Sequence, residues 1–316
     1  MTFQPPARNE VTVVELGPRD GLQNESVLLS VEARVAFVDA LAKAGLQRIE
    51  AGAFVHPSRM PQMAGSDEVC AGVRRLDSVT SRHVRISALV PNVKGLDRAA
   101  AAGIREVAVF PAASETFSQR NLNQSIEEAL QHAAAVCAVA ASLGIAVRGY
   151  ISTAFGCPYE GTVTPAAVIR VAERLLRAGV FEVAISDTIG VAHPGQVRAL
   201  LRDLRGVVPL AKTALHFHDT RGTALANVLA ALDRHVRVFD SSAGGLGGCP
   251  FAPGATGNLA TEDLLYMLHG LGLARDVDLD AVVAASAAIE PALGHGLPSR
   301  YYRAARARRP STVPSA

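Results

Sequence analysis

The sequence has no tryptophan, only four cysteines among its 316 residues, and an aromatic content of 5%. The cysteines, which show neither a CxxC pair nor a regular spacing, are Cys70, Cys137, Cys157 and Cys249. A disulfide framework like those of small secreted proteins is therefore not indicated. The N-terminal segment MTFQPPARNE also lacks the charged and then apolar pattern of a secretion signal. These absences favour a cytoplasmic protein whose thiols stay reduced.

Long apolar runs are missing as well, although 49% of the residues are hydrophobic and the mean hydropathy is +0.22. No stretch reaches the length of about 18 apolar residues that a bilayer requires. The net charge is only +2, from 31 Lys and Arg against 29 Asp and Glu, and the basic residues form no stripe. We therefore expect neither a membrane nor a nucleic acid as a partner.

Short β-branched segments alternate with longer helical patterns along the chain. The segments read as strands are 11–17, 48–54, 84–90, 106–112, 146–153, 182–188, 214–219 and 237–242. Between them lie amphipathic stretches with helix start and stop signals, such as Ser30 and Gly45, or Thr164 and Gly179. Eight strand–helix units predict an α/β protein with a closed (β/α)8 TIM barrel. The alternative is a doubly wound open sheet, but GPRDGLQNE follows the first strand where that fold would have a GxGxxG phosphate loop.

A glycine-rich loop, residues 243–258, follows the eighth strand and leads into two further helical patterns, TEDLLYMLHGLG and VDLDAVVAASAAIEPALG. We expect these to form additional C-terminal helices, and we take residues 1–303 as a single barrel domain that includes them. Residues 304–316 have no apolar period and are predicted to form a disordered tail. The apolar surface of the C-terminal helices suits a homodimer contact.

In a barrel of this kind, chemistry takes place at the C-terminal ends of the strands. His216 and His218 lie in the seventh predicted strand, and side chains two apart on a strand point to the same face. With a carboxylate such as Asp20 nearby, two imidazoles can hold a divalent metal ion. The alternative is one hydrogen-bonded core histidine and one loop histidine, but burying two imidazoles without a ligand is costly. We favour the metal site.

Two loops carry further candidates. Arg19 and Asp20 follow the first strand, where they either form a solvated ion pair or meet a substrate. Cys249 lies in the glycine-rich loop, which resembles a mobile lid. Its thiol is either inert or takes part in the reaction. Cys70 and Cys137 lie in helical patterns and are expected to be buried and inert.

At these residues the sequence resembles the 3-hydroxy-3-methylglutaryl-CoA lyase family of metal-dependent TIM-barrel acyl-CoA lyases. The resemblance runs from about Val11 to about His295 and rests on specific motifs, among them ELGPRDGLQNE (15–25), NLNQSIEEA (121–129), GCPYEG (156–161), SDTIGVAHPG (186–195), HFHDTRGTALAN (216–227) and GGLGGCPFAPGATGNLATEDLLYML (244–268). The resemblance implies retro-Claisen cleavage of a hydroxymethylglutaryl-CoA-type thioester to acetyl-CoA and a keto acid, acetoacetate. It also implies a place in leucine degradation.

The resemblance further implies that Asp20, His216, His218 and Asn258 bind Mg²⁺ or Mn²⁺. Two nitrogen and two oxygen ligands leave coordination positions open for a substrate hydroxyl and carboxylate. The ligand types alone leave Zn²⁺ and Fe²⁺ open, so the choice of metal rests on the resemblance.

The same resemblance implies the catalytic roles. Arg19 meets the negative charge that develops on the thioester oxygen, and Glu50 and Asp187 hold its guanidinium. Cys249 protonates the enolate carbon. Asp187 and His216 are both candidates for the group that removes the hydroxyl proton, and no CoA-contacting residue is indicated.

The chain departs from the usual family pattern at Gly52 and Ala53, at Ala184 and Ser186, and at Pro111. Neutral drift is one explanation. The other is a roomier pocket with fewer hydroxyl donors, which discriminates poorly between related acyl groups. On that reading the preferred substrate is citramalyl-CoA or a longer 3-substituted hydroxyglutaryl-CoA.

Three other functions compete with the lyase: a condensing synthase of the isopropylmalate or homocitrate type, a keto-acid aldolase, and a decayed barrel that serves as a metal-binding scaffold. Synthases usually carry an acid and arginine pattern where this chain has GGCPFAPGATGN. A decayed barrel would be expected to lose at least one of the ligands, acids or the thiol, and the chain retains all of them.

Overall fold

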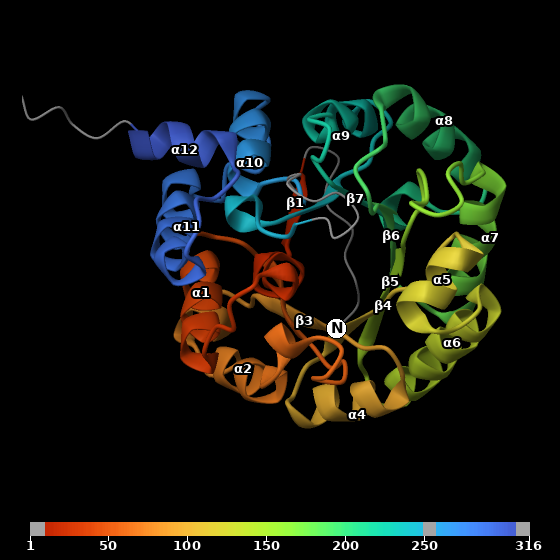
Figure 1. The fold of residues 1–316 in the computed structure, drawn as a ribbon, viewed down its shortest axis with the longest axis horizontal. Helices are drawn as coiled ribbons and strands as arrows, with labels where there is room; N and C mark the ends of the chain where they lie inside the picture. The colour runs from red at the N-terminus through yellow and green to blue at the C-terminus, as the bar shows by residue number, and fades with distance from the viewer. Residues whose placement is uncertain (1–9, 249–256, 308–316) are drawn as a thin grey trace, which may run out of the picture.

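The computed structural model describes residues 10–248 and 257–307, and a closed barrel of eight parallel strands forms its centre (Figure 1). The strands are Thr12–Glu15 (β1), Arg48–Ala53 (β2), Arg85–Leu89 (β3), Glu106–Val109 (β4), Ala146–Ile151 (β5), Glu182–Asp187 (β6), Thr213–Phe217 (β7) and Val238–Ser241 (β8). Seven of the eight lie within the predicted ranges, and β7 begins one residue before its predicted start. Pairing of β8 with β1 closes the barrel. The TIM-barrel prediction is confirmed.

Helices surround the barrel as the outer ring in Figure 1. They are Val31–Lys43 (α1), Ser66–Val73 (α2), Asp77–Thr80 (α3), Val93–Ala101 (α4), Glu115–Leu122 (α5), Ile126–Ser142 (α6), Pro165–Ala178 (α7), Pro194–Leu204 (α8), Ala224–Leu232 (α9), Thr261–Gly270 (α10), Leu279–Leu293 (α11) and Arg300–Ala307 (α12). No helix in the described part of the chain is both long enough and apolar enough to cross a membrane.

The predicted helix signals act as expected at α1 and α7. The Ser30 hydroxyl accepts a hydrogen bond from the Ala33 amide, and the Thr164 hydroxyl accepts one from the Ala167 amide. Gly45 and Gly179 follow these helices with φ angles of 101° and 105°, a left-handed conformation that residues with a side chain rarely adopt.

The C-terminal helices α10 and α11 lie between α9 and α1 in the ring, beside the closing strands of the barrel (Figure 1). Both were predicted. A connected cluster of buried apolar side chains extends from the barrel strands to residues such as Leu264 and Ile289 in these helices. This continuity supports a single domain, whose boundaries stay a prediction.

The prediction of a disordered tail from residue 304 is wrong for residues 304–307, because α12 continues to Ala307. The helix is anchored by Tyr302, whose ring is buried and whose hydroxyl donates a hydrogen bond to Glu290 of α11 at 2.7 Å. Tyr302 is the one buried residue of α12, and one buried position gives no apolar period, which is why the pattern missed the helix. The rest of the predicted tail, residues 308–316, lies outside the described residues.

Charged side chains fill part of the barrel interior, where aliphatic layers are usual. Arg48 of β2 donates to Glu182 of β6 at 3.0 Å and to Glu106 of β4 at 3.2 Å. Arg148 of β5 donates to Glu182 at 2.7 Å and to Asp240 of β8 at 2.7 Å. All five side chains are buried and paired with opposite charges. This interior ion layer links five strands beneath the C-terminal mouth of the barrel.

Candidate metal and catalytic site

The first strand ends in a turn that carries two charged side chains into the barrel mouth. A π-helical turn, Gly17–Gly21, follows β1 and contains Arg19 and Asp20. Their exposed fractions are only 5% and 9%. The alternative of a solvated ion pair at this turn is therefore wrong, because both charges are buried and need partners within the protein.

Asp20, His216 and His218 come together at this mouth. One candidate ligand atom from each side chain lies within 4.8 Å of the other two, and all three residues are buried. The two imidazole centroids are 5.2 Å apart. The prediction that the alternation of a strand directs both histidines into one site is confirmed.

Asn258 joins these three side chains from the segment that follows the glycine-rich loop. Its backbone forms a bridge with His218, and the Leu259 amide donates to the Phe217 carbonyl at 3.0 Å. Asn258 Nδ2 donates to Asp20 Oδ2 at 2.8 Å and to the Leu246 carbonyl at 3.1 Å. The amide nitrogen is thus committed to two acceptors, and the oxygen Oδ1 is left for another partner.

The charge states of these side chains suit a cation. Burial opposes ionisation of Asp20, but Arg19 beside it and the two histidines outweigh that effect and lower the pKa of Asp20 to about 2. Burial, reinforced by His216, lowers the pKa of His218 to about 3. At neutral pH the site therefore offers an ionised carboxylate and a neutral imidazole, which are the forms that bind metals.

Several buried atoms of the site have no hydrogen-bond partner among the described residues: His216 Nδ1, His218 Nδ1 and Asn258 Oδ1. Leaving a buried polar atom unpaired costs about 1–3 kcal/mol, so the unpaired His218 Nδ1 and Asn258 Oδ1 near Asp20 indicate a missing ligand, whereas His216 Nδ1 lies 3.3 Å from Asp240. A divalent cation fits this set of nitrogen and oxygen donors.

Arg19 is clamped beside the candidate metal ligands. Its Nε donates to Glu50 and its Nη1 donates to Asp20, and Nη1 also lies 3.3 Å from Gln23 Oε1. The guanidinium carbon lies 5.8 Å from the centre of the Tyr150 ring. The predicted contact with Glu50 is confirmed. These contacts leave the guanidinium little freedom, as a donor that meets a developing charge requires.

The prediction that Asp187 also holds Arg19 is wrong. The Asp187 carboxylate accepts hydrogen bonds from the Val191 and Ala192 amides at 2.9 and 3.0 Å and does not line the cavity at the barrel mouth. Ser186, its neighbour on β6, lines that cavity, so the alternation of the strand turns Asp187 away. Burial raises the pKa of Asp187 to about 6. Of the two candidates for the proton-removing group, His216 lines the cavity and Asp187 does not.

The cysteines divide as expected where the structure describes them. Cys70 and Cys137 are buried, and burial raises the pKa of their thiols to about 12 and about 11, which makes them unreactive. Cys249, the predicted acid, lies outside the described residues, so its role stays a prediction.

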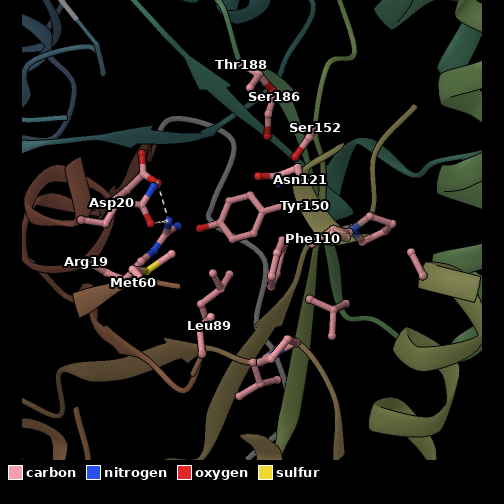
Figure 2. A pocket seen from close by; sticks show the side chains of 18 of the residues that line it. Arg19, Asp20, Met60, Leu89, Phe110, Asn121, Tyr150, Ser152, Ser186 and Thr188 are labelled. Carbon is pink, nitrogen blue, oxygen red and sulfur yellow. Dashed lines mark hydrogen bonds and ion pairs between the residues drawn. The ribbon is translucent and has the colours of Figure 1, made fainter. Parts of the chain in front are cut away.

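A cavity of about 600 Å³ opens above the strand ends. In Figure 2, Arg19 and Asp20 lie on one side, Asn121, Ser152, Ser186 and Thr188 lie together on another, and the Tyr150 ring lies between them. Apolar side chains complete the lining: Leu89 and Phe110 lie below and beside the Tyr150 ring in the view, and Met60 lies beside Arg19. The cavity therefore offers a polar end beside the candidate metal ligands and an apolar end away from them.

Of the five departures from the family pattern, only Pro111 and Ser186 line this cavity. Gly52 lies on β2 at a register shift, and a side-chain carbon there would meet the Ser66 hydroxyl at 2.8 Å. Its lack of a side chain thus serves the packing of α2 and does not enlarge the pocket. Ala53 and Ala184 are buried and do not line the cavity.

Sequence reasoning missed Tyr150, Arg148 and Asp240. The Tyr150 hydroxyl accepts from Arg148 Nη1 at 2.9 Å and lies 3.4 Å from Glu50 Oε2, so it connects the Arg19 clamp to the interior ion layer. The signal was available: Arg148 and Tyr150 are two apart in a strand that is otherwise apolar, and Asp240 is a lone acid in another. Such polar residues at alternate positions point into a barrel.

The HMGL-like family model matches residues 10–289. The chain belongs to the HMGL-like family. This HMGL-like chain is 52% identical over 290 residues to the hydroxymethylglutaryl-CoA lyase of Pseudomonas mevalonii, a match that covers 92% of this chain and 95% of the relative. It is 49% identical over 295 residues to the 3-hydroxy-3-isohexenylglutaryl-CoA/hydroxy-methylglutaryl-CoA lyase of Pseudomonas aeruginosa, covering 93% of this chain and 97% of the relative.

Solved structures agree with this HMGL-like assignment. The hydroxymethylglutaryl-CoA lyase from Pseudomonas aeruginosa superposes with a TM-score of 0.91 at 48% identity, covering 95% of this chain and 99% of the other. An HMG-CoA lyase from Acinetobacter baumannii in complex with coenzyme A and 3-methylmalate superposes with a TM-score of 0.88 at 34% identity, covering 99% of this chain and 100% of the other.

Two buried acids anchor the loop that leads toward Asn258. Glu15 accepts hydrogen bonds from the Ala243 amide at 2.8 Å and the Thr261 hydroxyl at 2.6 Å. Glu262 accepts from the Gly244 amide at 2.9 Å. Burial, despite these hydrogen bonds, raises the pKa of Glu15 to about 7 and that of Glu262 to about 8. In this HMGL-like chain the two acids fix where the segment between β8 and α10 begins.

We predict that stability falls as the pH rises from about 5 to about 8. A raised pKa means that the folded state holds a proton that the unfolded state has lost, so this contribution is full below the unfolded pKa and disappears as pH passes the folded pKa. Glu262→Gln, which is permanently neutral, should flatten the fall in the free energy of unfolding by up to about 1.4 kcal/mol per pH unit. Urea denaturation at several pH values measures this.

The matched control is Ser286→Ala, which removes the hydroxyl that donates to Glu262 at 2.5 Å but keeps the titrating carboxyl. That variant should retain the fall. An unchanged slope in Glu262→Gln would show that this carboxyl does not hold the proton.

Proposed function

We propose that this chain is a metal-dependent hydroxymethylglutaryl-CoA lyase that cleaves 3-hydroxy-3-methylglutaryl-CoA to acetyl-CoA and acetoacetate. The observation that carries the proposal is the approach of Asp20, His216 and His218 to within 4.8 Å, directly beside the clamped Arg19. A retro-Claisen cleavage needs these two parts together, because one end of the substrate loses a hydroxyl proton while the other gains negative charge.

The proposed ligands are Asp20, His216, His218 and Asn258, and the proposed cation is Mg²⁺ or Mn²⁺, following the family resemblance. When bound, such a cation lowers the pKa of a coordinated hydroxyl and fixes the substrate in the site. The chain's own contribution is to hold an ionised carboxylate, a neutral imidazole and a free amide oxygen in place.

Arg19 is proposed to act at the other end of the scissile bond. As the C2–C3 bond breaks, its electron pair moves onto C2 and the thioester oxygen to give an enolate, and the guanidinium held by Glu50 stabilises that oxygen. Cys249 is proposed to return a proton to C2, which completes acetyl-CoA. Asp187, through the Val191 and Ala192 amides, fixes the loop that follows β6.

The first prediction of this proposal is metal-dependent release of acetyl-CoA from 3-hydroxy-3-methylglutaryl-CoA. EDTA should abolish turnover, and Mg²⁺ or Mn²⁺ should restore it. His218→Ala should lose metal affinity, whereas Arg19→Gln should bind metal but lose about 100- to 1,000-fold in kcat, the usual effect of removing one oxyanion donor. Turnover that persists in EDTA would contradict the account. No turnover even with added metal would favour the decayed, metal-binding scaffold.

A second substrate is favoured by the apolar end of the cavity and by the isohexenylglutaryl activity named for the Pseudomonas aeruginosa relative. We propose that this end accepts a longer apolar substituent at C3. The residues that would contact it are Val55, Met60, Leu89, Phe110, Leu122 and Ala133.

We predict measurable cleavage of 3-hydroxy-3-isohexenylglutaryl-CoA alongside the methyl substrate. Ala133→Leu, which fills the apolar end, should lower kcat/KM for the isohexenyl substrate about 10-fold more than for the methyl one, because a filled pocket excludes the longer chain. Circular dichroism checks that the variant folds. Equal losses on both substrates would mean that the chain does not occupy this end.

The CoA moiety of the bound substrate is proposed to extend out of the cavity mouth, alongside Arg59. This side chain is exposed, lines the cavity, and makes no ion pair or side-chain hydrogen bond with the described residues. An unpaired guanidinium at the mouth suits a phosphate of CoA, to which arginine can donate two hydrogen bonds.

We predict that Arg59→Ala raises KM for the acyl-CoA about 5-fold with kcat nearly unchanged, and that Arg59→Lys has a smaller effect. The control is the same acyl group on pantetheine, which has no phosphate. If Arg59→Ala weakens that thioester just as much, Arg59 does not act through phosphate.

A further inference from the structure

Behind His216, on the side facing the barrel interior, lies the carboxylate of Asp240. Asp240 Oδ2 is 3.3 Å from His216 Nδ1, and both groups are buried. The two atoms are close but not aligned for a hydrogen bond, so Nδ1 is without a partner among the described residues. Hydrogen bonds of this kind are often loose in unliganded sites and tighten when the ligand binds.

Arg148 fixes Asp240 in this position. Its Nη2 donates to Asp240 Oδ1 at 2.7 Å and its Nη1 donates to Oδ2 at 3.1 Å. The guanidinium is itself held by Glu182, which accepts from Nε at 2.7 Å. The ion pair and two hydrogen bonds with Arg148 hold the Asp240 carboxylate in place against His216.

We propose that Asp240 is a positioning residue for the metal site: it accepts the Nδ1 proton of His216 and thereby leaves the Nε2 lone pair for the cation. The inference rests on the proposed function, because it assumes a cation at Asp20, His216, His218 and Asn258. A carboxylate behind a ligating histidine fixes both the tautomer and the orientation of the ring.

The same guanidinium supports the other half of the site. Arg148 Nη1 also donates to the Tyr150 hydroxyl at 2.9 Å, and that hydroxyl lies 3.4 Å from Glu50, the partner of Arg19. One buried arginine thus holds the acid behind the metal ligand and the group behind the catalytic arginine. The metal half and the arginine half of the site are placed relative to each other by the interior ion layer.

The test is Asp240→Asn, which keeps the shape of the side chain. Because Arg148 Nη2 makes the shorter contact, the amide oxygen should take the Oδ1 position, and the amide NH₂ should then face His216 Nδ1. That NH₂ donates to Nδ1 and drives the proton to Nε2, the tautomer that cannot bind the cation. We expect the Kd for Mn²⁺, measured by electron paramagnetic resonance of free Mn²⁺, to rise about 10- to 100-fold.

The matched control is Glu182→Gln. Glu182 is as buried as Asp240 and pairs with the same Arg148, but it makes no contact with His216. Both variants should lower the urea midpoint, because each disturbs the ion layer, whereas only Asp240→Asn should weaken Mn²⁺ binding beyond about 3-fold. Nitrogen-15 chemical shifts of His216 provide a direct readout of the tautomer.

The outcomes separate the two proposals. Equal weakening of Mn²⁺ binding in both variants, or a wild-type Kd in Asp240→Asn, would overturn the positioning role. Mn²⁺ binding that is weakened by His218→Ala but not by Asp240→Asn overturns this inference alone. A wild-type chain that binds no Mn²⁺, or whose binding His218→Ala leaves unchanged, overturns the proposed metal site and this inference with it.

Discussion

Closure of the barrel between β8 and β1 is the constraint on which the site depends. The pairing runs from Thr12 with Val238 to Glu15 with Ser241, and β7 pairs with β8 on the other side. The ends of three neighbouring strands therefore meet, although Asp20 and Asn258 are separated by 238 residues in sequence. No local element could bring these side chains together. The grouping of the candidate metal ligands is a product of topology, and the hydrogen bond between Asn258 and Asp20 joins the turn after β1 to the segment after β8.

The ion layer inside the barrel is costly to bury, and its value lies in geometry more than in stability. Paired buried charges gain little over well-packed apolar side chains of similar size. What the layer provides is direction, since each guanidinium fixes the orientation of the carboxylates that it contacts. Arg148 contacts Asp240, which lies behind the candidate metal ligand His216, and Tyr150, which lies beside Glu50 of the Arg19 clamp. Donors held in fixed positions in this way suit a reaction in which charge develops on both sides of the bond that breaks.

The sequence predicted the strands, the barrel and the two-histidine face because these depend on local pattern: apolar runs, capping residues and the two-residue period of a strand. The two-residue period correctly placed His216 and His218 on one face. The same period places Ser186 toward the cavity and Asp187 away from it, so the predicted contact of Asp187 with Arg19 was wrong. Asn258 was predicted as a ligand only from the family resemblance. Its position depends on a backbone bridge to His218, which no local pattern encodes. Arg148 and Asp240 were missed because their roles depend on which strands become neighbours across the barrel. The helix that includes residues 304–307 was missed because Tyr302 is its one buried residue and gives no apolar period.

The central claim is that one divalent cation is held jointly by side chains from the ends of β1, β7 and the segment after β8. Crystals grown with Mn²⁺ and measured near the manganese absorption edge test it most directly. The account predicts one anomalous peak at the barrel mouth, within bonding distance of Asp20, His216, His218 and Asn258. A peak elsewhere, or a mouth without one at saturating Mn²⁺, would contradict it.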